Sequence, residues 1–375
     1  MSAKQRVHLI AAARPNFMKI APLYHQLRKE EWCDVQVVHT GQHYDPNMSD
    51  AFFRDLRLPR PDFHLEVGSG THAQQTGGVM MAYEKICLEQ RPNWIIVVGD
   101  VNSTVACAMV GAKLWIPVVH LEAGLRSRDR KMPEEINRLA TDAICDVLWT
   151  PSADADENLK NEGVAPERID QVGNIMIDSY EMLRGQIEAD GSRKRLIPGW
   201  DRYGVVTLHR PSNVDNRDAL EIIVRQLIAT AAHLPLIFPI HPRTRNRLAE
   251  FTLLPLLQSC KDIILTEPLG YIEFMNLVVG SRAAITDSGG IQEETTYLRI
   301  PCLTLRENTE RPITLQGSNR LVKPQDIESV IDAALQGNWK AGAPPWNWDG
   351  RTASRCVAAL RKRAGVGPAA AVANA

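Results

Sequence analysis

Carboxylate side chains follow two apolar runs in the first third of the chain, and another begins a helical pattern just beyond them. Asp100 follows the run at 95–99, Glu122 follows the run at 118–121, and Glu134 comes directly after Pro133. If the runs are neighbouring parallel strands, their carboxyl ends meet at one edge, so we expect these three carboxylates to lie close together. Carboxylates grouped in this way shift one another's pKa values and suit general acid–base catalysis.

Each of these acids also has an ordinary structural interpretation. Asp100 precedes a helical segment and could cap it, and Glu122 could pair with Arg126 or Arg128. A glutamate at the start of a helix, such as Glu134, interacts favourably with the helix dipole. The alternatives to a catalytic role therefore stay open for all three.

Two cations follow the first apolar run, at 7–13. Pro15 suits the first turn of a helix, which puts Arg14 and Lys19 near the N-terminus of that helix. The unpaired backbone N–H groups and the dipole of a helix N-terminus favour anions. The alternative is that both side chains are simply solvated.

Histidines follow two apolar runs in the second half of the chain. His209 comes after the run at 204–208, and His241 comes after the run at 236–240. A histidine at the end of a strand can act as an acid, a base or a hydrogen-bond donor to phosphate. A structural role is the alternative for each.

The segment Ser288-Gly289-Gly290 joins an apolar run at 283–286 to a helical segment. Glycines lack Cβ atoms, so backbone N–H groups can approach a phosphate at the positive end of the helix. Glu294, early in that helix, could accept hydrogen bonds from ribose hydroxyls, and Arg311 adds a cation. A tight turn without a ligand has the same composition and is the alternative.

The elements that position these residues are apolar runs alternating with helical segments, which predicts α/β units with parallel sheets. In the first half the expected strands lie at 7–13, 35–40, 95–99, 118–121, 147–150 and 169–173, with helices at 17–30, 74–89 and 103–114. In the second half they lie at 205–208, 236–240, 263–266, 283–286 and 302–305.

The polar segment 184–203 interrupts this alternation and predicts a boundary between two domains. We expect an N-terminal Rossmann-like domain at 1–178, completed by a helix at 351–363, and a C-terminal Rossmann-like domain at 179–350. Residues 364–375 have little to bury and predict a flexible tail. Two doubly wound domains of this kind would face a central cleft at the carboxyl ends of both sheets.

Composition excludes several classes of partner. The chain has 375 residues, and 43 Lys and Arg balance 44 Asp and Glu for a net charge of -1. We therefore expect binding to neither nucleic acid nor membrane. Seven scattered cysteines without a C-x-x-C pair predict a reducing, cytoplasmic location. Without clustered His and Cys ligands or a G-x-G-x-x-G segment, we expect no metal and no cofactor.

Taken in order, these motifs resemble those of the non-hydrolysing UDP-N-acetylglucosamine 2-epimerases over roughly 7–362. The matching segments are Arg14-Pro15, Gly41-Gln42-His43, Gly99-Asp100, Glu122-Ala123-Gly124-Leu125-Arg126, Pro133-Glu134-Glu135-x-Asn137-Arg138, Gly173-Asn174, His209-Arg210, Asp287-Ser288-Gly289-Gly290-x-Gln292-Glu293-Glu294 and Thr309-Glu310-Arg311-Pro312. The resemblance implies the GT-B architecture, a UDP-sugar substrate and a homodimer.

The resemblance also implies roles for individual residues. Asp100, Glu122 and Glu134 match the family's catalytic carboxylates, with Arg138 in the same motif. On the UDP side, the implied residues are Arg14, His209, Ser288, Gly289, Gly290, Glu294 and Arg311. The implied reaction interconverts UDP-GlcNAc and UDP-ManNAc by eliminating UDP, through 2-acetamidoglucal, and adding it back.

Departures from the family pattern leave the substrate and the activity open. Gln42-His43-Tyr44-Asp45 stands where members activated by their own substrate tend to have Q-H-R-x, which fits a relative acting on another UDP-2-acetamido sugar, such as a diacetamido uronic acid. A GT-B glycosyltransferase would share the nucleotide site, and so would a nucleotide-sugar binding protein without catalysis.

Overall fold

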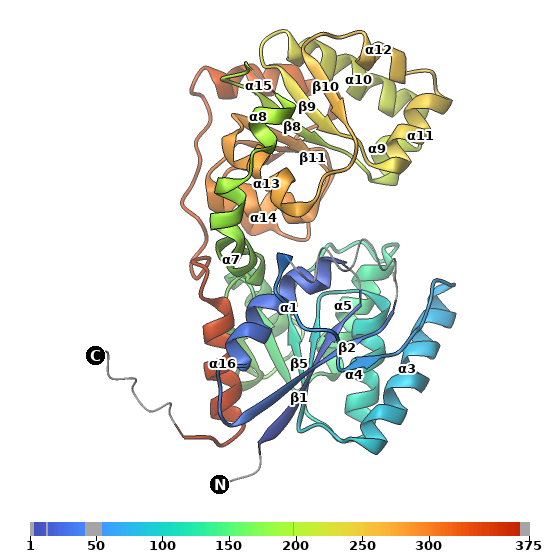
Figure 1. The fold of residues 1–375 in the computed structure, drawn as a ribbon, viewed down its shortest axis with the longest axis vertical. Coiled ribbons are helices and arrows are strands. Elements are labelled where there is room, and N and C mark those ends of the chain that lie inside the picture. Colours follow the sequence, from blue (N-terminus) through green and yellow to red (C-terminus); the bar gives the residue numbers. More distant parts are fainter. Residues whose placement is uncertain (1–3, 13, 42–54, 198, 368–375) are drawn as a thin grey trace, which may run out of the picture. The chain divides into compact units, whose positions relative to one another are not determined.

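Two compact units make up the chain. The computed structural model describes residues 4–12, 14–41, 55–197 and 199–367 (Figure 1). Unit 1 comprises residues 1–182 together with 346–375, and unit 2 comprises residues 183–345.

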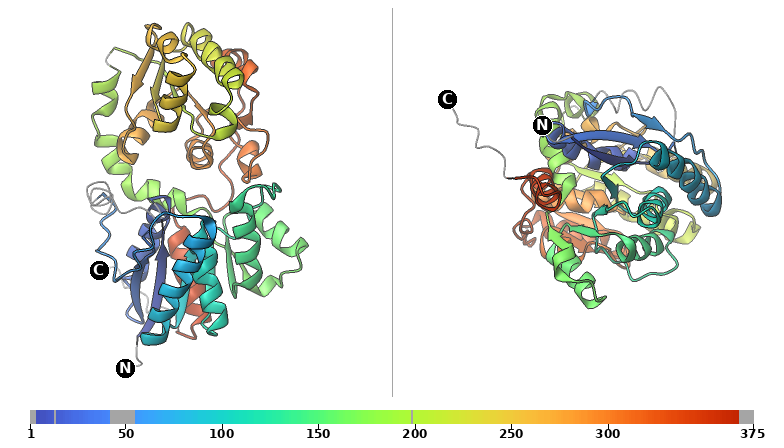
Figure 2. Two further views of the ribbon diagram at one scale, coloured as in Figure 1. Left: turned by 90° about the vertical axis from the view of Figure 1, so that its right-hand side faces the viewer. Right: turned by 90° about the horizontal axis from the view of Figure 1, so that it is seen from below.

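Unit 1 contains a seven-stranded parallel sheet in the order β3-β2-β1-β4-β5-β6-β7. Its strands are β1 Gln5–Ala11, β2 Cys33–His39, β3 Phe63–His64, β4 Trp94–Val98, β5 Val118–Leu121, β6 Val147–Thr150 and β7 Ile169–Gln171. Its helices are α1 Arg14–Leu27, α3 His72–Glu89, α4 Asn102–Lys113, α5 Pro133–Ile144, α6 Ala153–Asn161, α7 Ile175–Ala189 and α16 Thr352–Arg363. Every residue of β5 and β6 is buried, as expected for strands covered on both faces. Helices flank the strands of each unit (Figure 2).

Unit 2 repeats this arrangement with six parallel strands in the order β10-β9-β8-β11-β12-β13. Its strands are β8 Gly204–Thr207, β9 Leu236–Pro239, β10 Ile263–Thr266, β11 Ala283–Thr286, β12 Cys302–Thr304 and β13 Asn319–Leu321. Its helices are α8 Ser192–Leu196, α9 Pro211–Val214, α10 Arg217–Ala231, α11 Pro242–Glu250, α12 Leu254–Gln258, α13 Tyr271–Gly280, α14 Gly289–Leu298 and α15 Ile327–Leu335. Buried aliphatic side chains of β8 and β9 form the centre of its core with those of α10.

Helix α16 returns the chain to unit 1, where it packs against α1. The carboxylate of Asp178 accepts hydrogen bonds from the backbone N–H groups of Thr352 and Ala353, at 2.9 and 2.8 Å, and so satisfies the first amides of α16. Cys356 and Leu360 are buried on its inner face. The helix expected at 351–363 forms at Thr352–Arg363.

Much of the polar segment 184–203 is helical. Helix α7 runs to Ala189 across the division between the units, and α8 follows after a short turn. The side chain of Asn276 holds this segment, since it accepts from the Arg193 amide at 2.9 Å and donates to the Ile187 carbonyl at 2.8 Å. A tertiary contact therefore stabilises helices that lack a clear apolar period.

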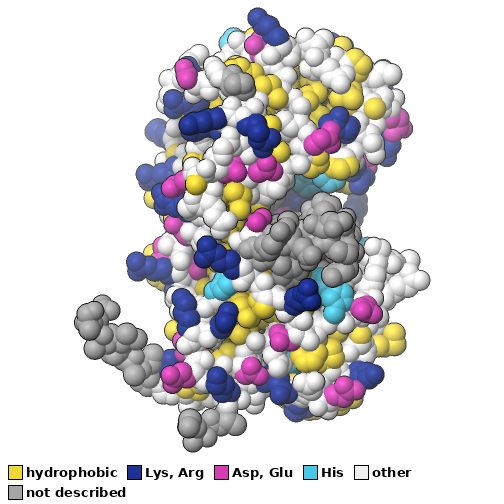
Figure 3. Space-filling view, viewed as in Figure 1, with side chains coloured by type: hydrophobic (Ala, Val, Ile, Leu, Met, Phe, Trp, Pro, Cys, Tyr) yellow, Lys and Arg dark blue, Asp and Glu magenta, His cyan; other side chains and the backbone are white. Residues whose placement is uncertain are grey.

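The described surface carries charges of both signs, as the balanced composition predicts. Acidic and basic side chains are interspersed over both units on the face shown in Figure 3. Within the described ranges, no helix is both long and apolar enough to cross a lipid bilayer. All seven cysteines are free thiols.

Candidate active site

Both sheets reverse their strand order at one point, and the predicted site residues follow the strands beside it. In unit 1 the reversal lies between β1 and β4, which precede Lys19 and Asp100. In unit 2 it lies between β8 and β11, which precede His209 and Ser288. Ligands of doubly wound sheets bind at the carboxyl ends of such strands. Each unit therefore carries one group of candidate residues.

In unit 1, a sharp turn after β5 directs Glu122 inward. Glu122 has a φ of 73°, a left-handed conformation that is strained for a residue with a side chain. The amides of Glu122 and Ala123 both donate to the carbonyl of Trp149 at 3.1 Å, which fixes the turn. Glu122 is only 4% exposed and forms an ion pair with the Lys19 ammonium group. A buried carboxylate on a strained turn is typical of a functional site.

The expected alternative partners of Glu122 are otherwise engaged. Arg126 pairs with Asp142 at 2.8 Å and with Glu162 at 2.6 Å. Arg128 donates to the side chain of Asn158 at 2.7 Å. Lys19, expected to bind an anionic ligand, thus holds the Glu122 carboxylate in this structure.

The turn after β4 lies against the Lys19–Glu122 pair. Gly99 has a φ of 70°, and a Cβ atom added there would lie 3.4 Å from both the Lys19 Nζ and the Glu122 Oε2 atoms. Buried Asn16 donates from Nδ2 to the Val98 carbonyl at 3.1 Å, which links α1 to the same turn. The peptide that leads into Asp100 is therefore packed against the buried ion pair.

Asp100 pairs with Arg138, which α5 presents from its second turn. Arg138 also pairs with the buried Glu135 at 2.9 Å. Burial alone would raise the pKa of Glu135, but hydrogen bonds from the Ser127 and Arg128 amides and from Arg138 lower it below its ordinary value. Sequence reasoning did not assign Glu135 a role, and the structure makes it the anchor of Arg138.

Glu134 precedes Glu135 on α5 and is exposed. Its place in the carboxylate group stays a prediction. Arg14 is the first residue of α1, and its side chain lies outside the described residues. Gln42 and His43 of the sequence motif, and the end of the expected tail from residue 368, lie outside them too.

In unit 2, Asp287 organises the turn that carries His209. Its fully buried carboxylate accepts from the His209 Nδ1 atom at 2.9 Å, from the Arg210 amide at 2.9 Å and from Asn213 Nδ2 at 3.0 Å. Burial would raise the pKa of Asp287, but the hydrogen bonds from His209 and Asn213 lower it. Nδ1 of His209 therefore donates to a carboxylate, which fixes the orientation of the ring.

His241 lies beside His209, with ring centroids 5.8 Å apart. Burial and the neighbouring His209 lower the pKa of His241, which favours its neutral form. Its Nδ1 atom accepts from the Arg243 amide at 3.2 Å, so His241 caps α11. The two histidines come together, as their positions after neighbouring strands predict.

The Ser288-Gly289-Gly290 segment is the N-terminus of α14, with Ser288 as the cap residue. A Cβ atom at Gly289 would lie 2.7 Å from Nη1 of Arg311, so this glycine lets the guanidinium group approach the helix start. No atom of the described residues would lie within 4 Å of a Cβ atom at Gly290. A side chain at Gly290 would therefore occupy open space beside this helix end, where unpaired amides favour an anion.

Two carboxylates hold Arg311 at this position. Its Nε atom lies 2.7 Å from Glu293, and it forms a second ion pair with Glu310. Arg306 also binds Glu310, at 2.6 Å. Burial would raise the pKa of Glu310, but Arg311 and Arg306 hold it well below its ordinary range.

Glu294 is buried on α14, where its Oε1 atom accepts from the Tyr271 hydroxyl at 2.7 Å. Burial raises the pKa of Glu294 to about 8, so its carboxyl group is largely protonated at neutral pH. Sequence reasoning found Glu294 but not Tyr271, because the two lie 23 residues apart and no local pattern links them.

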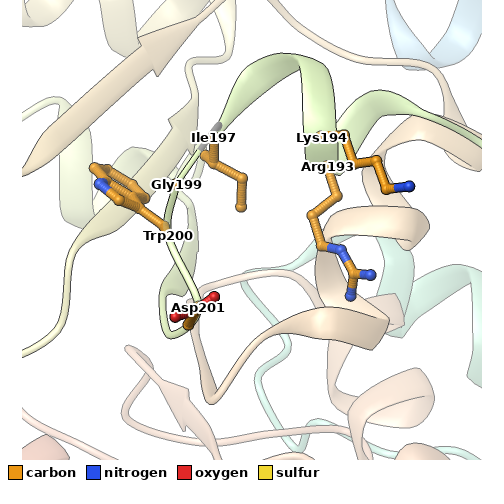
Figure 4. A pocket seen from close by; sticks show the side chains of 6 residues that line it. All are labelled: Arg193, Lys194, Ile197, Gly199, Trp200 and Asp201. Atoms are coloured by element: carbon orange, nitrogen blue, oxygen red, sulfur yellow. The ribbon is translucent and has the colours of Figure 1, made fainter.

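A separate pocket of about 340 Å³ lies beside α8. Its lining residues are Arg193, Lys194, Ile197, Gly199, Trp200 and Asp201, and none of the predicted site residues is among them. Trp200 extends away from Arg193 and Lys194 (Figure 4).

Comparisons with known proteins point to one family. The family model described as UDP-N-acetylglucosamine 2-epimerase matches residues 25–361. The chain is 41% identical over 345 residues to the UDP-N-acetylglucosamine 2-epimerase of Methanocaldococcus jannaschii, covering 89% of this chain and 94% of that protein. It is 37% identical over 321 residues to the UDP-2,3-diacetamido-2,3-dideoxy-D-glucuronate 2-epimerase of Pseudomonas aeruginosa, covering 84% and 88%.

The fold comparison gives the same result. The crystal structure of M. jannaschii UDP-GlcNAc 2-epimerase in complex with UDP-GlcNAc and UDP matches with a TM-score of 0.85 at 40% sequence identity. The match covers 95% of this chain and 99% of that chain. The α/β fold with two parallel, doubly wound sheets, as expected from the sequence, is confirmed.

Proposed function

This chain belongs to the UDP-N-acetylglucosamine 2-epimerase family, and from that premise we propose that it interconverts UDP-GlcNAc and UDP-ManNAc without net hydrolysis. The observation that carries the proposal is the buried Glu122 carboxylate, held by Lys19 on a strained turn beside Asp100. A glycosyltransferase needs an acceptor site and a single base, whereas here Asp100 and Glu122 follow the neighbouring strands β4 and β5.

The chemistry explains why several polar groups are required. The C2 proton of the sugar is not adjacent to a carbonyl, so its removal alone would leave an unstabilised carbanion. If the C1–O bond to UDP breaks as a base takes the C2 proton, the electron pair forms the C1–C2 double bond and UDP carries away the charge. Protonation of C2 from the opposite face and return of UDP to C1 then give the epimer. We assign the proton transfers to Asp100, Glu122 and Glu134 as a group.

Unit 2 supplies the groups that suit UDP. The amides after Ser288 and the Arg311 guanidinium group would bind the diphosphate, and His209 would stabilise it as it leaves. Glu294 would contact the ribose hydroxyls.

Proton NMR of a panel of UDP-2-acetamido sugars tests the substrate directly. We expect UDP-GlcNAc to convert to UDP-ManNAc, with no acceptor present. If a UDP-diacetamido uronic acid is the only sugar converted, that compound and not UDP-GlcNAc is the substrate. A panel that stays unchanged would contradict the proposed activity.

We also propose that the protein works in the cytoplasm as a homodimer. The free cysteines support a reducing location, and the family resemblance supports the dimer. Cell fractionation and light scattering of the purified protein test these two statements, and a monomeric mass would contradict the second.

A further inference from the structure

A histidine with both ring nitrogens engaged lies beneath the carboxylates of unit 1. His120 is the third residue of β5 and is fully buried. Its Nδ1 atom lies 2.6 Å from Oδ1 of Asp142 on α5. Its Nε2 atom lies 2.8 Å from the Gly99 carbonyl oxygen. Neither contact takes part in the proton transfers assigned to the carboxylates.

These partners determine the protonation state of the ring. A carbonyl oxygen can only accept, so Nε2 carries a proton. The second oxygen of Asp142 accepts from the Gly124 amide at 3.0 Å and from Nη1 of Arg126 at 2.8 Å. The ion pair with Arg126 favours the ionised form of Asp142, which places the proton between Oδ1 and Nδ1 on the histidine. A ring that donates from both nitrogens is an imidazolium cation.

The electrostatics of the surrounding elements agree with a charged ring. Burial would raise the pKa of Asp142, but His120 and Arg126 lower it below its ordinary value. The charged groups packed here are Asp142 of α5, Arg126 after β5 and Glu162 after α6. With His120 charged, this cluster has two positive and two negative charges, so its net charge is zero.

The same contacts connect the two turns that carry catalytic carboxylates. The Gly99 carbonyl belongs to the peptide that leads into Asp100, and the Gly124 amide lies two residues after Glu122. Both glycines are left-handed, with φ values of 70° and 80°. The pair formed by His120 and Asp142 therefore bonds to both turns.

We propose that His120, which donates from both ring nitrogens and is held by Asp142, is a positioning residue that sets the orientation of the Asp100 and Glu122 carboxylates. The proposal rests on the proposed function for its catalytic consequence, but the charge of the ring does not depend on it. Supporting groups of this kind, when removed, lower activity by about 10- to 100-fold.

Nitrogen-15 NMR of the histidine-labelled protein tests the charge. We expect His120 to show two ring N–H protons and imidazolium nitrogen shifts, because both ring nitrogens donate to buried acceptors. A neutral ring with one N–H proton in the native protein would overturn the proposal. This measurement needs no variant.

Asp142→Asn tests the positioning role. The amide oxygen of the new side chain still accepts from Gly124, while its NH₂ group donates to Nδ1 and leaves His120 neutral. We expect kcat to fall about 10- to 100-fold while the KM and the Kd for UDP stay within about threefold. The matched control is Glu162→Gln, which removes the other ion pair of Arg126 without contacting His120.

The outcomes separate this inference from the proposed function. If Asp142→Asn removes the imidazolium signals and kcat is unchanged, His120 does not position the carboxylates. If Glu162→Gln lowers kcat equally, the effect belongs to Arg126 and the inference is wrong. If the native protein epimerises no UDP-2-acetamido sugar, the proposed function is wrong. The NMR spectrum of His120 still tests the protonation of the ring independently.

Discussion

At the scale of single residues, three carboxylates of the candidate site each have a specific partner. Glu122 faces the Lys19 ammonium group, Asp100 faces Arg138, and Asp287 accepts from His209. An ion pair with little exposure to solvent keeps its geometry, since breaking it would leave a buried charge unpaired. Such pairs hold the reacting groups in place before substrate arrives.

Replacing Glu122 with glutamine should abolish most of the turnover. The amide has the shape of the carboxylate but cannot take a proton, so we expect kcat to fall by about 10²- to 10⁴-fold. The Kd for UDP, measured by calorimetry, should change little, because the proposed UDP groups lie in unit 2. Glu157→Gln, at an exposed position of α6, is the control. A variant that kept a tenth of native kcat would remove Glu122 from the mechanism.

Glu294 should make the stability of the ligand-free protein depend on pH. Its pKa is about 8 in the folded state and 4.5 ordinarily, so the unfolded chain releases this proton at lower pH. The contribution of Glu294 to the free energy of unfolding is therefore fully present below pH 4.5. It is lost as the pH rises towards 8, by at most about 1.4 kcal/mol per pH unit. Glu294→Gln should lose this dependence.

Thermal unfolding of both proteins from pH 5 to 8 measures the effect. We expect the Tm of the native protein to fall relative to that of Glu294→Gln as the pH rises. Parallel Tm curves would show that the folded state holds Glu294 charged. Glutamine keeps an acceptor for the Tyr271 hydroxyl, so the comparison isolates the charge.

The sequence predicted which residues carry chemistry better than it predicted their partners. Residues that directly follow apolar runs, such as Glu122 and His209, could be identified because the end of an apolar run in the sequence marks the end of a strand. Their anchors lie far along the chain: Lys19 is 103 residues from Glu122, and Asp287 is 78 residues from His209. Only the packing of separate elements brings such partners together.

At the scale of elements, the strand–turn–helix unit from β11 to α14 is the proposed diphosphate site. Gly290→Val should raise the Kd for UDP by at least about tenfold, because its side chain would fill the space before the helix amides. The fold should tolerate the change, since no described atom lies within 4 Å of the new Cβ.

Gly77→Val in α3 provides the control, because it too is a helical glycine with open space around it. Both variants should unfold at similar temperatures, and only Gly290→Val should lose UDP affinity in calorimetry. Native affinity in Gly290→Val would place the diphosphate elsewhere.

Most strand positions could be predicted from apolar runs in the sequence, and the elements that were missed have a physical explanation. Runs such as β5 and β6 are apolar throughout because both faces are buried, so their predicted limits match the structure. The edge strands β3 and β13 were not predicted, since each contains a single apolar residue and so forms no apolar run. Helix α8 was missed because its five residues depend on a contact with α13.

At the scale of the whole molecule, the proposed reaction requires exchange of a sugar proton with solvent. In D₂O we expect the epimerised product to carry deuterium at C2, since the base that receives the C2 proton exchanges with water. Long incubation should also release a little free UDP and 2-acetamidoglucal. Proton NMR and mass spectrometry measure both, and product without deuterium would contradict the elimination mechanism.

The chain order of the two units also governs how the protein is made. Unit 1 begins at the N-terminus but needs α16, whose buried Cys356 and Leu360 pack in unit 1. A ribosome therefore delivers all of unit 2 before the last helix of unit 1 emerges. Because domains fold as their residues leave the ribosome, unit 2 can complete first, while α1 lacks its partner until α16 has been synthesised. Chaperones that bind exposed apolar surface would meet this nascent chain at α1.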